Sequence, residues 1–131
     1  MHKKTKGSIA EMAVASNLLK RGWNVLFPFG ENNRYDLVAE KNGKFLKVQV
    51  KYVTPRKGVL SVGCKSSNNW SVDKYTPEQV DFIATYDSAN NKVYFVPSSS
   101  FNSSSIKLRI APARNKQKAN IKYAKNFVDF G

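Results

Sequence analysis

An acid, an amide and a lysine, Asp36, Gln49 and Lys51, lie on two stretches that alternate in hydropathy like β-strands, one on each side of Asn42-Gly43. Asn-Gly between such stretches is the strongest short signal for a two-residue hairpin turn. Counting outward from that turn places Asp36 opposite Gln49, and opposed residues project on the same face. Lys51 follows Gln49 by two residues and shares this face, because strand side chains alternate. The sequence therefore predicts a polar cluster on one face of a hairpin, whose other face is apolar and carries Leu37, Ala39, Leu46, Val48 and Val50.

A second carboxylate, Glu11, falls within the apolar arc of a helix expected over Ser8–Arg21. At 3.6 residues per turn, this arc also carries Ile9, Met12, Ala15, Leu18 and Leu19. A carboxylate on a packing face is costly unless it is paired, capped or bound to a metal. If the helix packs against the hairpin, Glu11 reaches the cluster around Asp36.

This combination of residue types suits Mg²⁺-dependent hydrolysis of phosphodiester bonds, because Mg²⁺ prefers oxygen ligands. Asp36 would be the central ligand, and Glu11 would join it directly or through water. Gln49 would offer its side-chain oxygen, and the backbone carbonyl of Val50 another. Lys51 would orient the attacking water or stabilise the developing charge.

Each residue also has a purely structural interpretation. Ser8 and Glu11 fit a capping box, in which Glu11 bonds the Ser8 backbone amide, and this role is compatible with metal binding. Asp36 fits a solvated acid at a strand edge. Lys51 fits an ordinary surface lysine or an ion-pair partner of Asp36.

Composition excludes several other classes of protein. The chain has 131 residues, with 41% hydrophobic residues, and we expect one domain over residues 1–131. The single histidine, His2, leaves no histidine-based zinc site and no Ser-His-Asp triad, and the single cysteine, Cys64, excludes an internal disulfide. No stretch suits a membrane span or a signal peptide, so we expect an intracellular protein, cytoplasmic or nucleoid-associated.

The formal charge of +13, from 22 basic and 9 acidic residues, points to an anionic partner, of which nucleic acid is the commonest. A basic N-terminal tail and a basic C-terminal segment carry much of it, and residues 107–125 contain seven basic residues and no acid. Trp70 suits a core position better than stacking on DNA. The candidates for DNA contact are Lys57, Lys65, Arg109, Arg114, Lys116 and Lys118.

The order of expected elements indicates an α/β or α+β fold with a mixed sheet. A final helix is expected over Ala119–Phe127, a polar loop over Lys65–Trp70, and a helix start at Thr76–Gln79. The expected strands are Trp23–Phe27, Tyr35–Lys41, Lys44–Val53, Val59–Cys64, Phe82–Tyr86 with its partner Lys92–Val96, and Ile106–Ile110.

Three segments carry a resemblance to the PD-(D/E)XK nuclease superfamily: Gly7–Glu11 on a helix, then Arg34–Val38, then Val48–Lys51. More narrowly, the chain resembles the group I intron-associated PD-(D/E)XK homing endonucleases, in which the second acid is commonly Gln. This likeness runs from about Thr5 to Arg109. Tyr35 replaces the Pro that precedes the Asp, and Gln49 replaces an acid, which weakens the attraction for Mg²⁺.

The resemblance implies a restriction-endonuclease-like core, with a central mixed β-sheet flanked by helices. It also implies Mg²⁺ (or Mn²⁺) as cofactor, double-stranded DNA as substrate and a homo-oligomer, dimer or tetramer. Archaeal Holliday-junction resolvases share the layout and are the nearest rival. A non-catalytic DNA-binding protein on a nuclease scaffold and an RNA-binding basic module are the alternatives from other classes.

Overall fold

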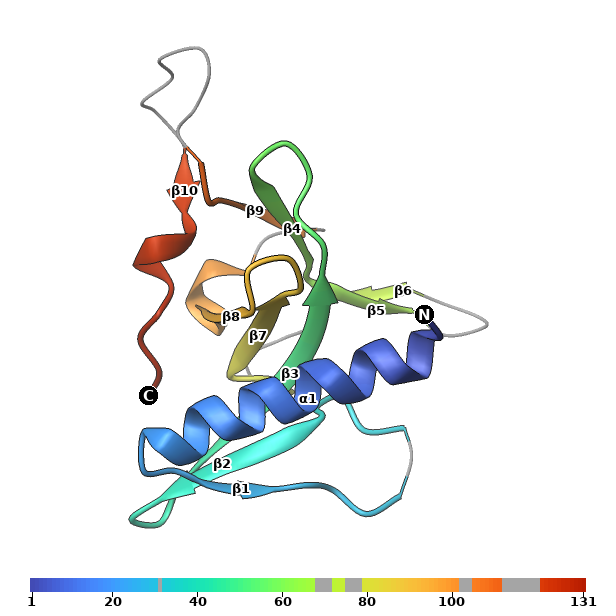
Figure 1. The fold of residues 1–131 in the computed structure, drawn as a ribbon. Coiled ribbons are helices and arrows are strands. Elements are labelled where there is room, and N and C mark those ends of the chain that lie inside the picture. The colour runs from blue at the N-terminus through green and yellow to red at the C-terminus, as the bar shows by residue number, and fades with distance from the viewer. Residues whose placement is uncertain (31, 68–71, 75–78, 102–104, 112–120) are drawn as a thin grey trace.

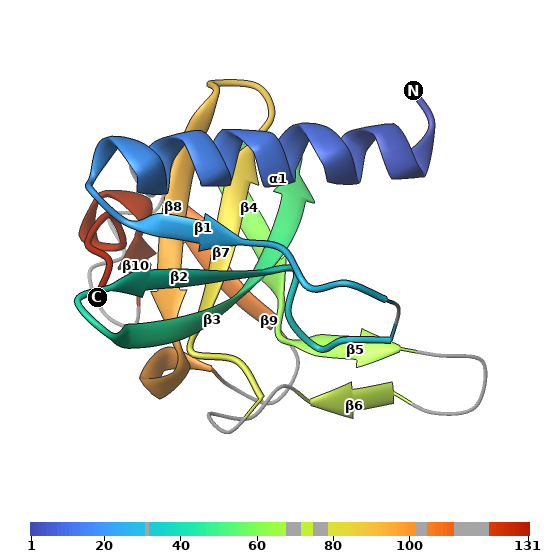
Figure 2. The same cartoon turned by 90° about the horizontal axis from the view of Figure 1, so that it is seen from below.

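A computed structural model describes residues 1–30, 32–67, 72–74, 79–101, 105–111 and 121–131 of the chain. Its centre is a five-stranded sheet in the order β1-β2-β3-β7-β8, and the long helix α1 crosses one face of it (Figure 1). Figure 2, a view of the molecule from below, shows the same helix running across the strands. The elements of this layer are α1 (Lys3–Lys20), β1 (Asn24–Leu26), β2 (Leu37–Lys41), β3 (Lys44–Val53), β7 (Phe82–Asp87) and β8 (Lys92–Pro97).

Two smaller sheets complete the fold. A three-stranded sheet has the order β10-β9-β4, and a two-stranded one pairs β5 with β6. These elements are β4 (Val59–Gly63), β5 (Lys65–Ser67), β6 (Val72–Lys74), β9 (Ser105–Arg109) and β10 (Lys122–Tyr123), with the 3₁₀ turns η1 (Ser98–Ser100) and η2 (Ala124–Asn126).

The hairpin register predicted from Asn42-Gly43 is confirmed. Lys41 pairs with Lys44, and Val38 pairs with Lys47. Asn42 and Gly43 both have positive φ angles, of 52° and 80°, as a two-residue type I′ turn requires. The local sequence alone therefore sets which residues of β2 and β3 face each other.

The central sheet is mixed, as expected. β3 pairs in parallel with β7, whereas β1–β2, β2–β3 and β7–β8 are antiparallel. β7 is buried on both faces: Ala84 and Tyr86 pack in the core under α1, and Ile83 packs in a second core against the small sheet of β4 and β9. One α-helix, and not several, covers the central sheet within the described ranges.

The helix starts earlier than predicted, at Lys3 and not at Ser8. His2 caps it, because its Nδ1 accepts a hydrogen bond of 3.1 Å from the Lys4 amide. Ser8 lies inside the helix, where its hydroxyl donates to the Lys4 carbonyl at 3.1 Å. The capping-box interpretation of Glu11 is therefore wrong, and the basic N-terminal residues belong to the first turn of α1 and not to a tail.

The buried face of α1 is rotated from the predicted arc. Met12 and Leu19 are 57% and 58% exposed, so they lie outside it. The buried side chains are those of Ala10, Val14, Ala15 and Leu18. Glu11 still lies among them, because it is one turn from Val14 and Ala15 and two turns from Leu18 on the helix surface.

The prediction of a C-terminal helix over Ala119–Phe127 is wrong for residues 121–127, the part of this range that the structure describes. The chain forms β10, which pairs in parallel with β9, and then η2. The carbonyl of Phe127 then accepts a hydrogen bond of 2.6 Å from the Phe95 amide, so this segment covers the edge of β8. Phe130 follows and packs against Phe95, with ring centroids 4.9 Å apart. Pairing with distant strands and burial of an aromatic ring outweigh the weak local helix propensity here.

Two other predictions concern segments that the structure describes only in part. Lys65–Ser67 forms β5 and so is not part of a loop. Trp70 and the helix start at Thr76 lie outside the described residues, and Gln79, just beyond that start, is in a turn. Among the helices of the described ranges, none is long and apolar enough to cross a membrane.

Candidate active site

Asp36 is held directly over β3. Its amide donates to the Val48 carbonyl at 2.8 Å, and its Oδ2 accepts a hydrogen bond of 2.7 Å from the Val50 amide. Leu37 pairs with Val48, so the same register places Asp36 opposite Gln49. The carboxylate therefore lies at the point where β2 begins and meets the middle of β3.

Lys51 is electrostatically coupled to Asp36. Burial raises the pKa of the Asp36 carboxyl, and the Val50 amide and the Lys51 ammonium only partly oppose this shift. Burial lowers the pKa of Lys51, opposed in turn by the negative charge of Asp36. Each ion is thus partly removed from water and depends on the other for compensation.

Glu11 faces the same site from α1. Glu11 and Asp36 both line a cavity of about 270 Å³. Burial is the main cause that raises the pKa of Glu11, and the charge of Asp36 raises it further. The structure therefore brings together the two carboxylates that were predicted to meet, on a helix and a strand that are distant in sequence.

The oxygen atoms gathered here suit a hard divalent cation. Two partly buried carboxylates repel each other, and a bound cation removes that cost. The amide of Gln49 is half-buried on β3, and the carbonyl of Val50 adds a backbone oxygen. No group of three or more His, Cys, Asp and Glu side chains that could hold a metal occurs in the described part of the chain. Gln49 is the predicted third side-chain ligand.

The remaining wall of the cavity was not predicted. It is formed by the loop between β1 and β2, through Phe27, Pro28, Gly30, Asn32, Asn33 and Tyr35. The Gly and Asn residues indicated a loop, and Gly30 and Asn32 indeed have positive φ angles of 100° and 66°. No local signal shows that this loop folds back over the helix, because that approach depends on the packing of α1 on the sheet.

Of the residues predicted to contact DNA, Lys57 and Arg109 do not line this cavity. Lys57 is exposed in the turn before β4, with a φ angle of 52°. Arg109 ends β9, and its Nε donates to the Ala111 carbonyl at 3.2 Å. Lys65 begins β5. The other three candidates lie outside the described residues: Arg114, Lys116 and Lys118.

Glu11 of α1 and Asp36, just before β2, thus line one cavity, and Lys51 of β3 is coupled to Asp36. A sequence model of the PD-(D/E)XK endonuclease family matches residues 1–130. The chain belongs to the PD-(D/E)XK endonuclease family. The nucleases of this family generally use divalent metals.

Two individual proteins are similar to this PD-(D/E)XK endonuclease. The solved structure of a bacterial homing endonuclease, I-Ssp6803I, superposes with a TM-score of 0.78 at 29% identity, covering 97% of this chain and 88% of that one. Protein 5.3 of Escherichia phage T7 is 46% identical over 48 residues, which are 37% of this chain and 41% of that protein. The matched region thus spans less than half of the phage protein. The structural likeness confirms the predicted restriction-endonuclease-like fold.

Proposed function

We propose that this protein is a metal-dependent DNA endonuclease of the homing type, which hydrolyses phosphodiester bonds at a specific double-stranded target. The observation that carries the proposal is that Glu11 and Asp36 line one cavity, with Lys51 coupled to Asp36. Family membership supports the reaction, and the likeness to a bacterial homing endonuclease over 97% of the chain supports the homing type.

The ligands of the cation would be the carboxylates of Glu11 and Asp36, the side-chain oxygen of Gln49 and the carbonyl of Val50. Mg²⁺ or Mn²⁺ bound there supplies charge neutralisation at the phosphate and an activated water. The hydrogen bond from the Val50 amide fixes one oxygen of Asp36, so that the carboxylate is oriented before any ligand arrives.

Lys51 acts on the phosphate and its attacking water. Its ammonium lies near Asp36 and away from bulk solvent, where its attraction for an anion is stronger than at an exposed surface. It would orient the water and stabilise the negative charge that develops on the phosphate oxygens. A neutral side chain at this position provides neither function.

The substrate would be bound through basic residues outside the cavity, with contacts from Lys57, Lys65, Arg109, Arg114, Lys116 and Lys118.

Each chain has one site of this kind and cuts one strand, so a double-strand break requires a homodimer or homotetramer. A pseudo-palindromic target follows from that symmetry. The enzyme would act where its DNA substrate is, inside the cell, in the cytoplasm or at the nucleoid, and group I intron mobility is the corresponding biological setting.

Gln49 favours one alternative, a DNA-binding protein that does not cut. A neutral ligand attracts Mg²⁺ less than a carboxylate does, so binding without catalysis is its prediction. A Holliday-junction resolvase is the alternative among nucleases, and it predicts cleavage of four-way junctions in preference to linear duplex.

The deciding experiment incubates the protein with supercoiled plasmid, linear duplex and a four-way junction, each with Mg²⁺ and with EDTA. We expect Mg²⁺-dependent cutting of duplex by the wild type and none by Asp36→Asn or Lys51→Ala. Lys44→Ala, in the exposed hairpin turn, is the matched control and should cut normally. Tight binding without any cutting supports the non-catalytic alternative, and cutting by both site variants shows that the site assignment is wrong.

A further inference from the structure

A second hollow lies on the other side of α1. It has a volume of about 610 Å³ and is lined from α1, β8 and the C-terminal segment. Ser16 and Lys20 follow Glu11 by five and nine residues, which at roughly 100° per residue places them about 140° and 180° around the helix from it. β8 is also the edge strand farthest from β1 in the central sheet. This hollow is therefore separate from the cavity at Glu11 and shares no residue with it.

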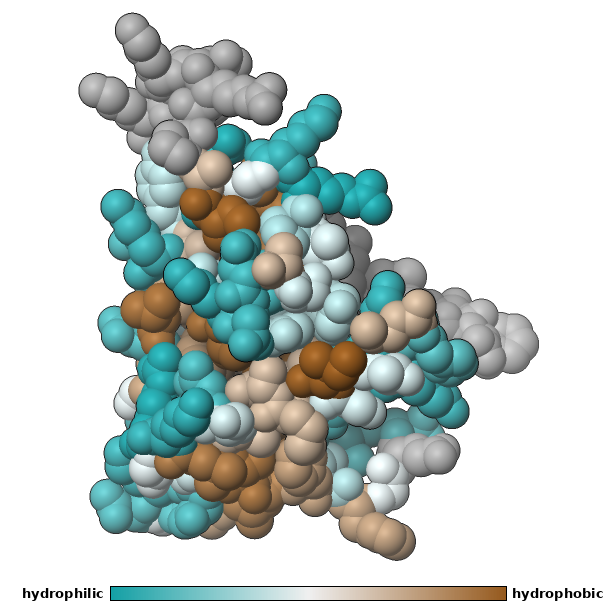
Figure 3. Space-filling model, in the orientation of Figure 1, coloured by the Kyte–Doolittle hydropathy of each residue, from teal (hydrophilic) through white to brown (hydrophobic). Residues whose placement is uncertain are grey.

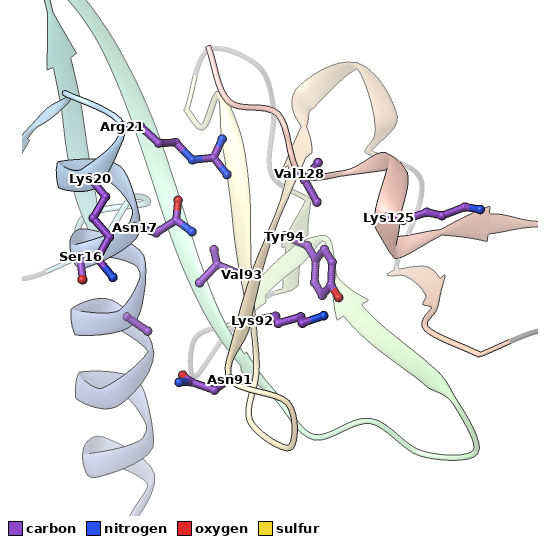
Figure 4. A pocket seen from close by; sticks show the side chains of 11 residues that line it. Ser16, Asn17, Lys20, Arg21, Asn91, Lys92, Val93, Tyr94, Lys125 and Val128 are labelled. Carbon is purple, nitrogen blue, oxygen red and sulfur yellow. The ribbon is translucent and has the colours of Figure 1, made fainter.

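The charge of this hollow has one sign. Among the described residues, its walls carry Lys20 and Arg21 at the end of α1, Lys92 on β8 and Lys125 in η2, and no acidic residue. Burial raises the pKa of the wall residue Tyr94, and so does the nearby carboxylate of Asp87, which is itself fully buried. In Figure 4, Arg21 and Asn17 point from the helix toward β8, while Lys92 and Tyr94 project from β8 toward the segment that carries Lys125. Cations from three segments that are distant in sequence thus surround one space.

The hollow continues into a neighbouring one of about 480 Å³, because both are lined by Lys92, Tyr94 and Lys125. The second hollow adds Arg109 and Tyr123, and again no acid among the residues that the structure describes. We call the two together the β8 groove. On the face shown in Figure 3, hydrophilic and hydrophobic side chains are interspersed between the end of α1 and the C-terminal segment.

Two contacts hold the groove in shape. The guanidinium of Arg21 lies over the ring of Phe95, 5.1 Å from its centroid, and the ammonium of Lys125 lies over Tyr123 at 5.5 Å. The Oδ1 atom of Asn17 is buried and has no hydrogen-bond partner among the described residues. This side chain lies in the wall of the groove, where its Nδ2 can donate to a phosphate oxygen and its Oδ1 can accept from a water.

We propose that the β8 groove binds the phosphodiester backbone of a second segment of DNA, apart from the strand held at Asp36. Five cations, Lys20, Arg21, Lys92, Arg109 and Lys125, follow one another along a continuous surface that no carboxylate of the described residues lines, and a polyanion of regular spacing matches this arrangement. The choice of DNA as the polyanion rests on the proposed function. The inference adds a second DNA-binding surface to that function.

The test compares two variants that each lose three positive charges. Lys20→Gln/Lys92→Gln/Lys125→Gln alters the groove, and Lys44→Gln/Lys107→Gln/Lys122→Gln removes three exposed lysines that line neither hollow. Binding of a fluorescein-labelled 40-base-pair duplex is measured in EDTA over a series of salt concentrations. Each lost phosphate contact lowers the salt slope by about 0.9, so the groove variant should have a slope lower than the control by about 2 to 3, with at least about tenfold weaker binding at low salt.

Equal slopes and affinities for the two variants would overturn the proposal. The proposal also fails if only the groove variant changes its sedimentation mass while duplex binding is unaltered, because that result assigns the groove to self-association. Loss of polyglutamate binding with intact duplex binding assigns it to an acidic protein and also contradicts the proposal. Because the assay is run in EDTA, it reads groove binding even if the wild type never cuts DNA, and so its failure is distinct from failure of the nuclease assignment.

Discussion

The cavity at Glu11 and the β8 groove lie on opposite sides of α1 and differ in the charge of the residues that line them. On one side, Glu11 and Asp36 share a small cavity, and burial raises the pKa of both carboxyls. On the other side, the described residues that line the β8 groove include cations and no acid. The comparison indicates that two of the nine acids are brought together at the proposed cation site, and that part of the positive charge lies on the opposite side of the helix, where it can add affinity for DNA without competing for that site.

The largest expected effect is that of substitutions at the candidate active site. Asp36→Asn and Lys51→Ala should each lower the single-turnover rate of duplex cleavage by about 10³-fold or more, because each removes an interaction that is stronger in the transition state. Both variants should still bind duplex in EDTA. Quenched time courses at saturating protein give the rate, and gel shifts give the binding. A variant that cuts within tenfold of the wild type would contradict the assignment.

Glu11 should have an intermediate effect. Glu11→Gln keeps the shape of the side chain but removes one charge, and we expect the Mg²⁺ concentration for half-maximal cleavage to rise by about 10- to 100-fold. High Mg²⁺ should restore most of the rate. Titration of Mg²⁺ at fixed enzyme separates this outcome from a purely structural role, in which the rate falls and added metal does not restore it.

Phe130→Ala tests whether packing of the C-terminal segment maintains the shape of the β8 groove. The Phe130 ring packs against Trp23, Phe82 and Phe95, with centroid distances of 5.0, 4.6 and 4.9 Å. Its removal should lower the free energy of unfolding by about 2–3 kcal/mol, because a large half-buried ring is lost. The salt slope of duplex binding should fall toward that of the groove variant. Urea denaturation and binding isotherms measure the two effects, and an unchanged slope would show that the groove does not depend on this segment.

The smallest expected effect concerns stability and pH. Asp36 has a pKa raised by burial, so the folded state binds its proton more tightly than the unfolded chain does, and folding is favoured as the pH falls. At neutral pH in EDTA, Asp36→Asn should therefore be slightly more stable than the wild type. The difference should shrink as the pH falls through the raised pKa toward the ordinary Asp value near about 4. Urea midpoints at several pH values check this, and Mn²⁺ should stabilise the wild type and not the variant.

The hairpin could be predicted because its determinants are local. Asn42-Gly43 sets the turn, the turn sets the register, and the register places Asp36 opposite Gln49. Glu11 could be placed on the packed face of α1 from periodicity, although the centre of that face lies closer to Val14 than predicted. These features depend on residues within a few positions of one another.

The features that were missed depend on contacts between distant segments. The early start of the helix at Lys3 is an exception, because its cap, His2, is local; it was missed because histidine is not among the strongly preferred capping residues. β10 forms by parallel pairing with β9, which no local pattern announces. The β8 groove combines Lys20 with Lys92 and Lys125, and only the closed fold brings them together.

The central claim is that Asp36 and Glu11 hold one divalent cation beside Lys51. The most direct measurement is a titration of Mn²⁺ into the wild type, Asp36→Asn and Glu11→Gln, with bound metal followed by electron paramagnetic resonance. The account predicts one site per chain in the wild type, a Kd raised about 10- to 100-fold in Glu11→Gln, and no binding at the same concentrations in Asp36→Asn. Mn²⁺ binding by Asp36→Asn as tight as that of the wild type would contradict it.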